Sequence, residues 1–486
     1  MNKDNELFEI ENGVLTKVKN ENITEAVIPE GVTEIEKETF DGCSNLKSIT
    51  IPNSVTKIGK SAFRGCKSLT NVIIPEGVTE IGEGAFDSCT KLKNITIPNS
   101  VTKIERLAFA NCESLEEIII PEGVKEIESC AFLRCESIKK IILPKSIAKI
   151  GESAFNNCSS LESVIISSKI KVERRAFYEC SPSLTFFTPN GEKTDIDLFD
   201  IKDNVLIGIT KDVKEVVIPK GVTKIERFAF EGCKSLKKVI IPESVTEIKW
   251  GTFCGCTSLK DVIIPDSVIK INEIAFWGCK SLTNVIIPET VTEIGDGAFC
   301  KCENLEKVVL SEGLEKIGDA AFKESNSLTS INIPKSVKKI GIVAFMWCES
   351  LASVVISKGT KIDAGAFYNC SPSFSFYTPD GEKIEREINC IKNGVFLGTI
   401  KDVSEISIPE GVTEIGKEAF GSCENLKKVI LPKSVSKIGE AAFWDCTSLT
   451  NVTIPKDLKF TENTFSGCTS LKSLTTHEGE EIPLNN

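Results

Sequence analysis

The chain has 486 residues, 41% hydrophobic and 26% charged, and this balance excludes a disordered chain. The formal net charge of −11 arises from Lys and Glu mixed along the whole sequence, and the lack of a basic block argues against nucleic acid as a partner. The longest apolar runs span a few residues, whereas a membrane helix needs about 20, so we expect no membrane insertion.

The N-terminal segment consists of a charged start and a predicted cap. The start, MNKDNELFEI, lacks the apolar stretch of a signal peptide, so a cytoplasmic location is expected if residue 1 is the natural start. The stretch FEIENGVLTKVKNENITEAVIP at 8–29 repeats half of an element that interrupts the chain twice further on. We expect it to cover the open core of the first repeat.

A repeat governs the rest of the chain. A marker Phe recurs every 23 residues, with a last step of 22 in each group, which gives seventeen repeats in groups of seven, seven and three. A larger period of 190 residues relates the groups and indicates a duplicated block. The marker positions are Phe40, Phe63, Phe86, Phe109, Phe132, Phe155, Phe177, Phe230, Phe253, Phe276, Phe299, Phe322, Phe345, Phe367, Phe420, Phe443 and Phe465.

One repeat, residues 69–89, shows why the phrase returns. Leu69, Val72 and Ile74 form a short strand pattern that Pro75 ends, since proline cannot donate a ladder hydrogen bond. Apolar side chains in the second half, including the marker Phe86, are expected to turn inward. Because one such unit cannot bury enough apolar surface alone, neighbouring units must complete its core, and the pattern predicts a mainly β solenoid.

Two segments interrupt the repeat, at about 181–215 and 371–405. Each carries an Asn-Gly or Asp-Gly turn signal followed by a second turn, which predicts a pair of hairpins or one enlarged repeat. The predicted domains are therefore residues 1–189 with the cap and seven repeats, residues 190–379 with a junction and seven repeats, and residues 380–486 with a junction and three repeats.

The cysteines do not indicate a metal site. Sixteen of the twenty lie three residues after a marker Phe, and Ser325 takes the remaining place, so we expect a reduced, buried row. The C-x-C pairs at Cys254/Cys256 and Cys300/Cys302 would each divide between inside and outside, so no metal or cofactor is expected. The one histidine, His477, is predicted to be a solvated tail residue beside no nucleophile, and we expect no enzyme activity.

The strings LTNVIIPEGVTEIGEGAFDSC at 69–89 and LKNITIPNSVTKIERLAFANC at 92–112 carry a family resemblance. Their pattern resembles the BspA-like (Treponema pallidum type) leucine-rich repeats along nearly the whole chain. The resemblance implies a curved, right-handed coil with a parallel sheet on its concave face. It also implies a surface or secreted protein that adheres to host or matrix proteins.

The outward face of this sheet is the predicted protein-binding site. A β-branched stripe edged by polar residues suits a protein partner, although β-branched residues are also good strand formers on any exposed sheet. A spacer or assembly module without a ligand is the alternative, and a carbohydrate site is less favoured because the face has almost no aromatics. The candidates are Asn71, Ile73, Asn94, Thr96, Ile119, Lys140, Ile142, Ile165, Lys238, Ile240, Asp261, Ile263, Asn284, Ile286, Lys307 and Val309.

A second patch is predicted in the loop after the marker Phe. Aromatic residues and Met at variable exposed positions are enriched in interfaces, but they can also fold onto the flank of a coil and widen its core. Both interpretations stay open for Trp277, Met346, Trp347 and Trp444.

Overall fold

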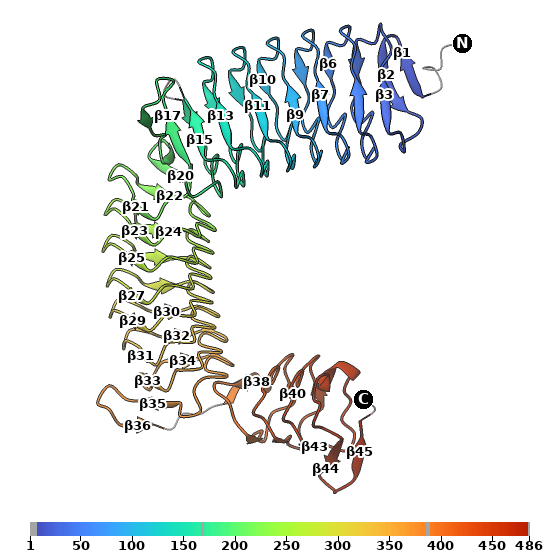
Figure 1. Ribbon diagram of the computed structural model, residues 1–486. Helices are drawn as coiled ribbons and strands as arrows, with labels where there is room; N and C mark the ends of the chain where they lie inside the picture. Colours follow the sequence, from blue (N-terminus) through green and yellow to red (C-terminus); the bar gives the residue numbers. More distant parts are fainter. Residues whose placement is uncertain (1–6, 167–169, 385–388, 485–486) are drawn as a thin grey trace. The chain divides into compact units, whose positions relative to one another are not determined.

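The computed structural model describes residues 7–166, 170–384 and 389–484. The chain winds into successive coils, and most coils contribute one longer and one two-residue strand, which lie beside the corresponding strands of the neighbouring coils (Figure 1). The residues form two compact units, Met1–Asp212 and Val213–Asn486, which are taken one at a time below. The predicted mainly β solenoid with 23-residue repeats is confirmed.

The repeat at residues 69–89 buries its apolar side chains as predicted. In β7 (Asn71–Ile73) the middle residue, Val72, is 3% exposed while its two neighbours point outward. Val78, Ile81 and Phe86 complete the interior with exposures of 2% or less. Gly82 follows β8 (Glu80–Ile81) because the preceding coil is too close for a side chain: a Cβ there would lie 2.6 Å from the backbone nitrogen of Lys60.

In the first unit, the longer strands of the coils form one sheet system and two-residue strands form the other. The long strands are β3 (Glu25–Val27), β5 (Ser48–Thr50), β7, β9 (Asn94–Thr96), β11 (Glu117–Ile119), β13 (Lys140–Ile142), β15 (Ser163–Ile165) and β17 (Thr185–Phe187). The short strands are β4 (Glu34–Ile35), β6 (Lys57–Ile58), β8, β10 (Lys103–Ile104), β12 (Glu126–Ile127), β14 (Lys149–Ile150) and β16 (Lys171–Val172).

The second unit repeats this arrangement. Its long strands are β21 (Glu215–Val217), β23 (Lys238–Ile240), β25 (Asp261–Ile263), β27 (Asn284–Ile286), β29 (Lys307–Val309), β31 (Ser330–Asn332), β33 (Ser353–Val355), β35 (Ser375–Tyr377), β39 (Glu405–Ser407), β41 (Lys428–Ile430), β43 (Asn451–Ile454) and β44 (Ser473–Thr476). Its short strands are β22 (Lys224–Ile225), β24 (Glu247–Ile248), β26 (Lys270–Ile271), β28 (Glu293–Ile294), β30 (Lys316–Ile317), β32 (Lys339–Ile340), β34 (Lys361–Ile362), β40 (Glu414–Ile415) and β42 (Lys437–Ile438). A 3-10 helix, η2 (Glu462–Phe465), replaces the last marker turn.

The marker phenylalanines stack face to face through each core. Phe63 and Phe86 have ring centroids 5.1 Å apart and planes 11° apart, and both rings are fully buried. Beside this stack, the Cys89 thiol donates a hydrogen bond to the carbonyl of Phe63 at 3.1 Å. Ser325 does the same for Phe299 at 3.3 Å, which explains why a serine can stand in the cysteine row.

Hairpins cover the ends of the repeat blocks, as predicted. In the first unit these are β1 (Phe8–Glu11) with β2 (Val14–Val18), β17 with β18 (Lys193–Thr194), and β19 (Phe199–Lys202) with β20 (Val205–Ile209). In the second unit they are β35 with β36 (Lys383–Ile384), β37 (Asn389–Lys392) with β38 (Val395–Thr399), and β44 with β45 (Glu481–Pro483). Both predicted interruptions are therefore pairs of hairpins.

The segment after β38 closes the last coil of the second block. The amide of Phe367 donates to the carbonyl of Ile400 at 2.8 Å, and the Asp402 carboxylate accepts the amide of Asn369. A separate core cluster includes Met346 and Tyr368 before this junction and extends to Leu474, whereas the described units divide at Asp212/Val213. The three predicted domain ranges stay predictions.

Candidate functional site

The long-strand face comprises the outward first and third residues of the long strands. Its third-residue row is strongly exposed, with 74% for Ile73, 79% for Ile119 and 66% for Ile286. The parallel register aligns these side chains from strand to strand, since Thr96 lies opposite both Ile73 and Ile119. The face therefore presents β-branched side chains in a row that no other described segment covers.

The structure places all sixteen predicted protein-binding residues on this face. Within the first unit it aligns the members from Asn71 to Ile165, and within the second unit those from Lys238 to Val309. Ile165, Lys238 and Ile240 are half-buried, whereas the other thirteen are exposed. Whether any of them binds a protein stays a prediction.

A hollow lies on the long-strand face between β11 and β13. Strands β3 to β11 form one hydrogen-bonded sheet and β13 to β18 form another, so the ladder is interrupted at this point. The hollow has a volume of about 990 Å³ and exposes Ile119 and Ile142 between charged side chains. The sequence analysis did not single out this place, and it missed the acidic wall residues Glu116 and Glu122.

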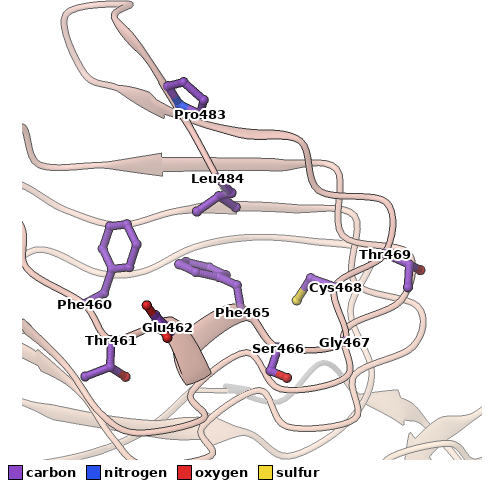
Figure 2. Close-up of a pocket in the computed structure, with 10 residues that line it drawn as sticks. All are labelled: Phe460, Thr461, Glu462, Phe465, Ser466, Gly467, Cys468, Thr469, Pro483 and Leu484. Carbon is purple, nitrogen blue, oxygen red and sulfur yellow. The ribbon is translucent and has the colours of Figure 1, made fainter. Parts of the chain in front are cut away.

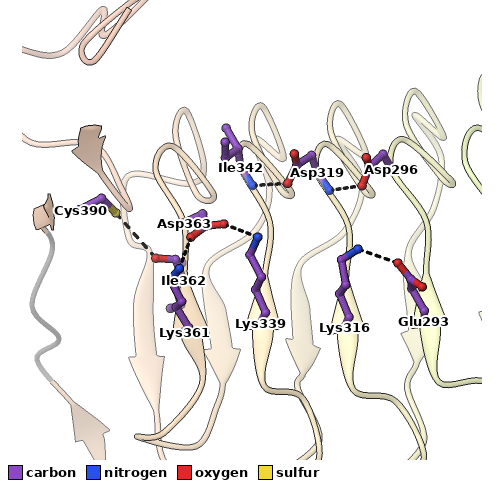
Figure 3. Close-up of polar contacts among 10 residues, drawn as sticks. All are labelled: Glu293, Asp296, Lys316, Asp319, Lys339, Ile342, Lys361, Ile362, Asp363 and Cys390. Atoms are coloured by element: carbon purple, nitrogen blue, oxygen red, sulfur yellow. Dashed lines mark hydrogen bonds and ion pairs between the residues drawn. The ribbon is translucent and has the colours of Figure 1, made fainter. Parts of the chain in front are cut away.

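The short-strand face comprises the outward first residues of the two-residue strands. Lys57 lies 3.3 Å from Glu34 and 3.9 Å from Glu80, so successive coils pair their charges. In the second unit, Figure 3 shows Lys316 paired with Glu293 at 2.6 Å and Lys339 paired with Asp363 at 2.9 Å. The hydrogen bond lowers the pKa of the Glu293 carboxyl and raises the pKa of the Lys316 ammonium. This face is largely neutralised by its own residues.

Loops beside the short strands of the second unit also pair with one another. Asp296 accepts the amide of Asp319 at 2.8 Å, and Asp319 accepts the amide of Ile342 at 2.8 Å (Figure 3). Each of these carboxylates accepts a hydrogen bond from a backbone amide of the next coil. They therefore have a structural explanation that needs no ligand.

The second predicted patch is not a uniform surface. Met346 is 7% exposed and packs in the core cluster of the second junction, so it cannot contribute to an exposed patch. Trp277 and Trp444 are exposed to 37% and 48%. The Lys323 ammonium lies 4.4 Å from the ring centre of Trp347, which is half-buried. A binding role of the three tryptophans stays a prediction.

A second hollow, of about 630 Å³, lies at the last coil (Figure 2). Figure 2 shows the rings of Phe460 and Phe465 beside Leu484, and the ring planes of the two phenylalanines cross at 86°. Phe465 and Cys468 are 7% and 4% exposed, so little apolar surface is accessible. The hollow brings together no group of ionisable side chains and is the weaker candidate.

The described residues show no arrangement that supports catalysis or metal binding. Burial raises the pKa of the Cys158 thiol to about 12 and raises that of Cys135, which keeps these thiols protonated and unreactive. No cluster of three potential metal ligands occurs among the described residues. His477 is not the solvated residue that the sequence analysis expected: its ring is half-buried and lies 2.8 Å from the carbonyl of Leu431. Within the described ranges, no helix has the length and apolar character to cross a membrane.

The chain is similar to several proteins of solved structure. The chain is similar to a leucine-rich repeat protein from Bacteroides ovatus, at 28% identity over 83% of this chain and 91% of that one, with a TM-score of 0.34. It is also similar to a leucine-rich cell surface protein from Faecalibacterium prausnitzii, at 25% identity over 86% and 90%, with a TM-score of 0.40. The pneumococcal vaccine antigen PcpA matches at 21% identity over 73% and 74%, with a TM-score of 0.36. No match was found among curated proteins.

The sequence pattern itself identifies the family. The model of the BspA type leucine rich repeat region (6 copies) matches residues 16–119, 85–200, 199–325, 269–390 and 389–483. These matches together extend without a gap over residues 16–483, which include all seventeen marker phenylalanines. The chain belongs to the BspA-type leucine-rich repeat family.

Proposed function

We propose that this protein is a non-enzymatic scaffold that binds a protein partner through its long-strand face, in adhesion to a host or matrix protein at a cell surface. The observation that supports the proposal is the row of exposed isoleucines, of which Ile119 is 79% and Ile142 55% exposed. An apolar row with polar borders loses unfavourable contact with water when a partner covers it.

The contrast with the short-strand face strengthens this choice. A row of alternating Lys and Glu, such as Lys57 between Glu34 and Glu80, has already paired its charges within the molecule. Displacing those pairs would cost a partner desolvation of both charges. The long-strand face offers apolar contact without that cost.

Affinity capture with quantitative mass spectrometry tests the proposal. We expect the double variant Ile119→Lys/Ile142→Lys to lose the proteins that the unmodified chain retains, because each ammonium group would be desolvated in the interface. The matched control, Ile269→Lys/Ile342→Lys, changes two side chains that are 55% and 49% exposed and lie outside the long-strand face. Equal retention by all three proteins would contradict the proposal and favour a spacer without a ligand.

A further inference from the structure

The hollow between β11 and β13 has two walls of opposite charge. The β11 wall carries Glu116, Glu117 and Glu122, and the β13 wall carries Lys139 and Lys140. Each of these glutamates is followed 23 residues later, at the same place in the next coil, by a lysine. For Glu122 this lysine is Lys145, and the backbone amide of Lys145 donates a hydrogen bond to the Glu122 carboxylate at 3.2 Å. The reversal therefore extends along the whole length of both strands.

An apolar floor lies between these walls. Ile119 and Ile142 are the third residues of β11 and β13, and their exposures are 79% and 55%. Both belong to the lining of the hollow, and Pro121 and Pro144 lie beyond them at the same end of the strands. A ligand bound in the hollow would contact apolar side chains at its base and side chains of opposite charge on its two sides.

The charges of the two walls do not neutralise one another. Among the described residues, the wall side chains form one ion pair, Glu116 with Lys93 at 3.5 Å, in which both side chains are more than half exposed. Such a pair contributes about 0–1 kcal/mol and separates easily. No ion pair in the described ranges joins Glu117 to Lys140, although they occupy the same place in successive coils. On the short-strand face, Lys103 does reach Glu128 of the next coil at 3.0 Å.

From this charge pattern we infer that the hollow takes an extended peptide segment of a partner protein, with an apolar side chain on Ile119 and Ile142, a basic side chain toward β11 and an acidic side chain toward β13. The inference rests on the proposed function, because it assumes that the long-strand face binds protein. Nucleic acid fits poorly, since Glu117 and its neighbours would repel phosphate. Complementary charges on both sides would set the register of the segment, and the apolar contact would supply most of the affinity.

A random dodecamer library displayed on phage, selected against the complete chain, tests this inference. We expect enriched peptides with an apolar residue between a basic and an acidic one. Against such a synthetic peptide, Lys140→Glu should weaken binding at least tenfold, because the acidic side chain then faces a carboxylate. A second peptide with that acid replaced by Lys should recover the binding to the variant. Lys316→Glu is the matched control, since it makes the same change of charge on the short-strand face and should leave binding unchanged.

The outcomes separate this inference from the proposed function. If the peptides bind Ile119→Lys/Ile142→Lys as tightly as the unmodified chain, they bind outside the long-strand face, and this result contradicts both the inference and the proposed function. If the peptides lose binding to this double variant but bind Lys140→Glu as tightly as the unmodified chain, the long-strand face remains the binding site and the proposed charge recognition is wrong. A selection that enriches no sequence would overturn the peptide inference, and thermal melts of each variant check that the coil stays folded.

Discussion

The two outer faces of each coil come from the same 23-residue repeat and yet present opposite chemistry. On the long-strand face Ile73 is 74% exposed and lies in a row of β-branched side chains. On the short-strand face of the neighbouring coil, Lys57 lies between two glutamates and has paired with both. The repeat therefore specifies the interior, while each outer row can vary independently.

The length of the strands explains this difference. A long strand presents its first and third residues outward, so one row can be polar while the other is apolar. A short strand presents one residue outward, and its neighbours in the adjacent coils lie close enough for a charge of opposite sign. Exposed ion pairs contribute about 0–1 kcal/mol each, so the paired row mainly removes free charge from that face.

The largest effect should come from the interior that the two faces share. Phe109 is fully buried and stacks between Phe86 and Phe132 at 5.6 and 5.3 Å. We expect Phe109→Ala to reduce the free energy of unfolding of the first unit by about 3–5 kcal/mol, because it leaves a cavity in the stack. Urea denaturation followed by circular dichroism measures the loss.

Hydrogen exchange shows whether this loss reaches both faces. If the faces are two sides of one coil, the amides of β9 and β11 and those of β10 and β12 should lose protection together in Phe109→Ala. Phe109→Leu is the control and should cost much less. Loss of protection on one face alone would contradict the shared interior.

Asp402, three residues after β38 at the second junction, should dominate the pH dependence of the second unit, because its carboxylate is largely buried whereas those of the faces are solvated. Burial raises the pKa of Asp402 from 3.8 to about 6, and the amide of Asn369 opposes the shift. The folded state therefore binds the proton more tightly than the unfolded state. Stability from this group is highest at low pH and falls as pH rises through about 6.

Urea midpoints of the second unit should therefore increase between pH 7.5 and pH 5. The full shift corresponds to about 3 kcal/mol at about 1.4 kcal/mol for each pKa unit. Because the folded and unfolded states differ in protonation mainly between pH 3.8 and about 6, the gain from pH 7.5 to pH 5 is about 1.4 kcal/mol. Asp402→Asn should flatten this dependence. His477→Gln is the control for the one histidine of the chain. A slope that persists in Asp402→Asn and vanishes in His477→Gln would refute the assignment.

Each residue of the cysteine row should contribute less to the free energy of unfolding than Phe109 or Asp402. We expect this contribution to come from one hydrogen bond per coil. Cys89 is fully buried and its thiol donates to the carbonyl of Phe63 at 3.1 Å. We expect Cys89→Ala to be less stable than Cys89→Ser by about 1 kcal/mol, because serine can keep the bond that Ser325 makes at the equivalent place. Thermal melts of the two variants at equal pH decide the order. Equal stability of the two variants would mean that the hydrogen bond contributes nothing and that the cysteine side chain stabilises the coil only by filling space.

The interior was predictable from the sequence because it repeats with one period. Leu69, Val72 and Phe86 recur in register through the chain, and all three are 3% exposed or less. A left-handed residue lies two places before every marker except Phe465, and most of these were not predictable, because residues such as Leu107 and Ile274 adopt φ of 58° and 46° where a sequence would signal a turn by glycine. Tertiary packing imposes those angles.

The candidate site was predictable in part. The outward row follows directly from strand alternation, so Ile73 and Ile119 could be placed on one face from the sequence. The hollow lies where the ladder between β11 and β13 is interrupted, and the regular repeat of the sequence gives no signal of that interruption. The charge reversal from Glu117 to Lys140 is visible in the aligned repeats, but without the hollow it looks like ordinary surface polarity.

The smallest effects should come from single outer residues, and they distinguish the two faces most directly. Lys316→Ala removes the nearer of the two lysines that pair with Glu293, whose side chain is 29% exposed, and should cost about 0.5 kcal/mol at pH 7. Because the pKa of Glu293 is lowered in the folded state, this cost should be present above the ordinary carboxyl pKa and disappear as pH falls below it. Salt should reduce it as well.

Ile286→Thr is the counterpart on the long-strand face of the same unit. This side chain is 66% exposed and the substitution keeps a β-branched residue in the strand, so the change in unfolding free energy should stay within about 0.5 kcal/mol. It should also be independent of pH and salt, since no charge is involved. Urea titrations at low and high salt compare the two variants. If the loss of stability depended on salt in Ile286→Thr, or did not depend on it in Lys316→Ala, the short-strand face would not differ from the long-strand face by its ion pairs.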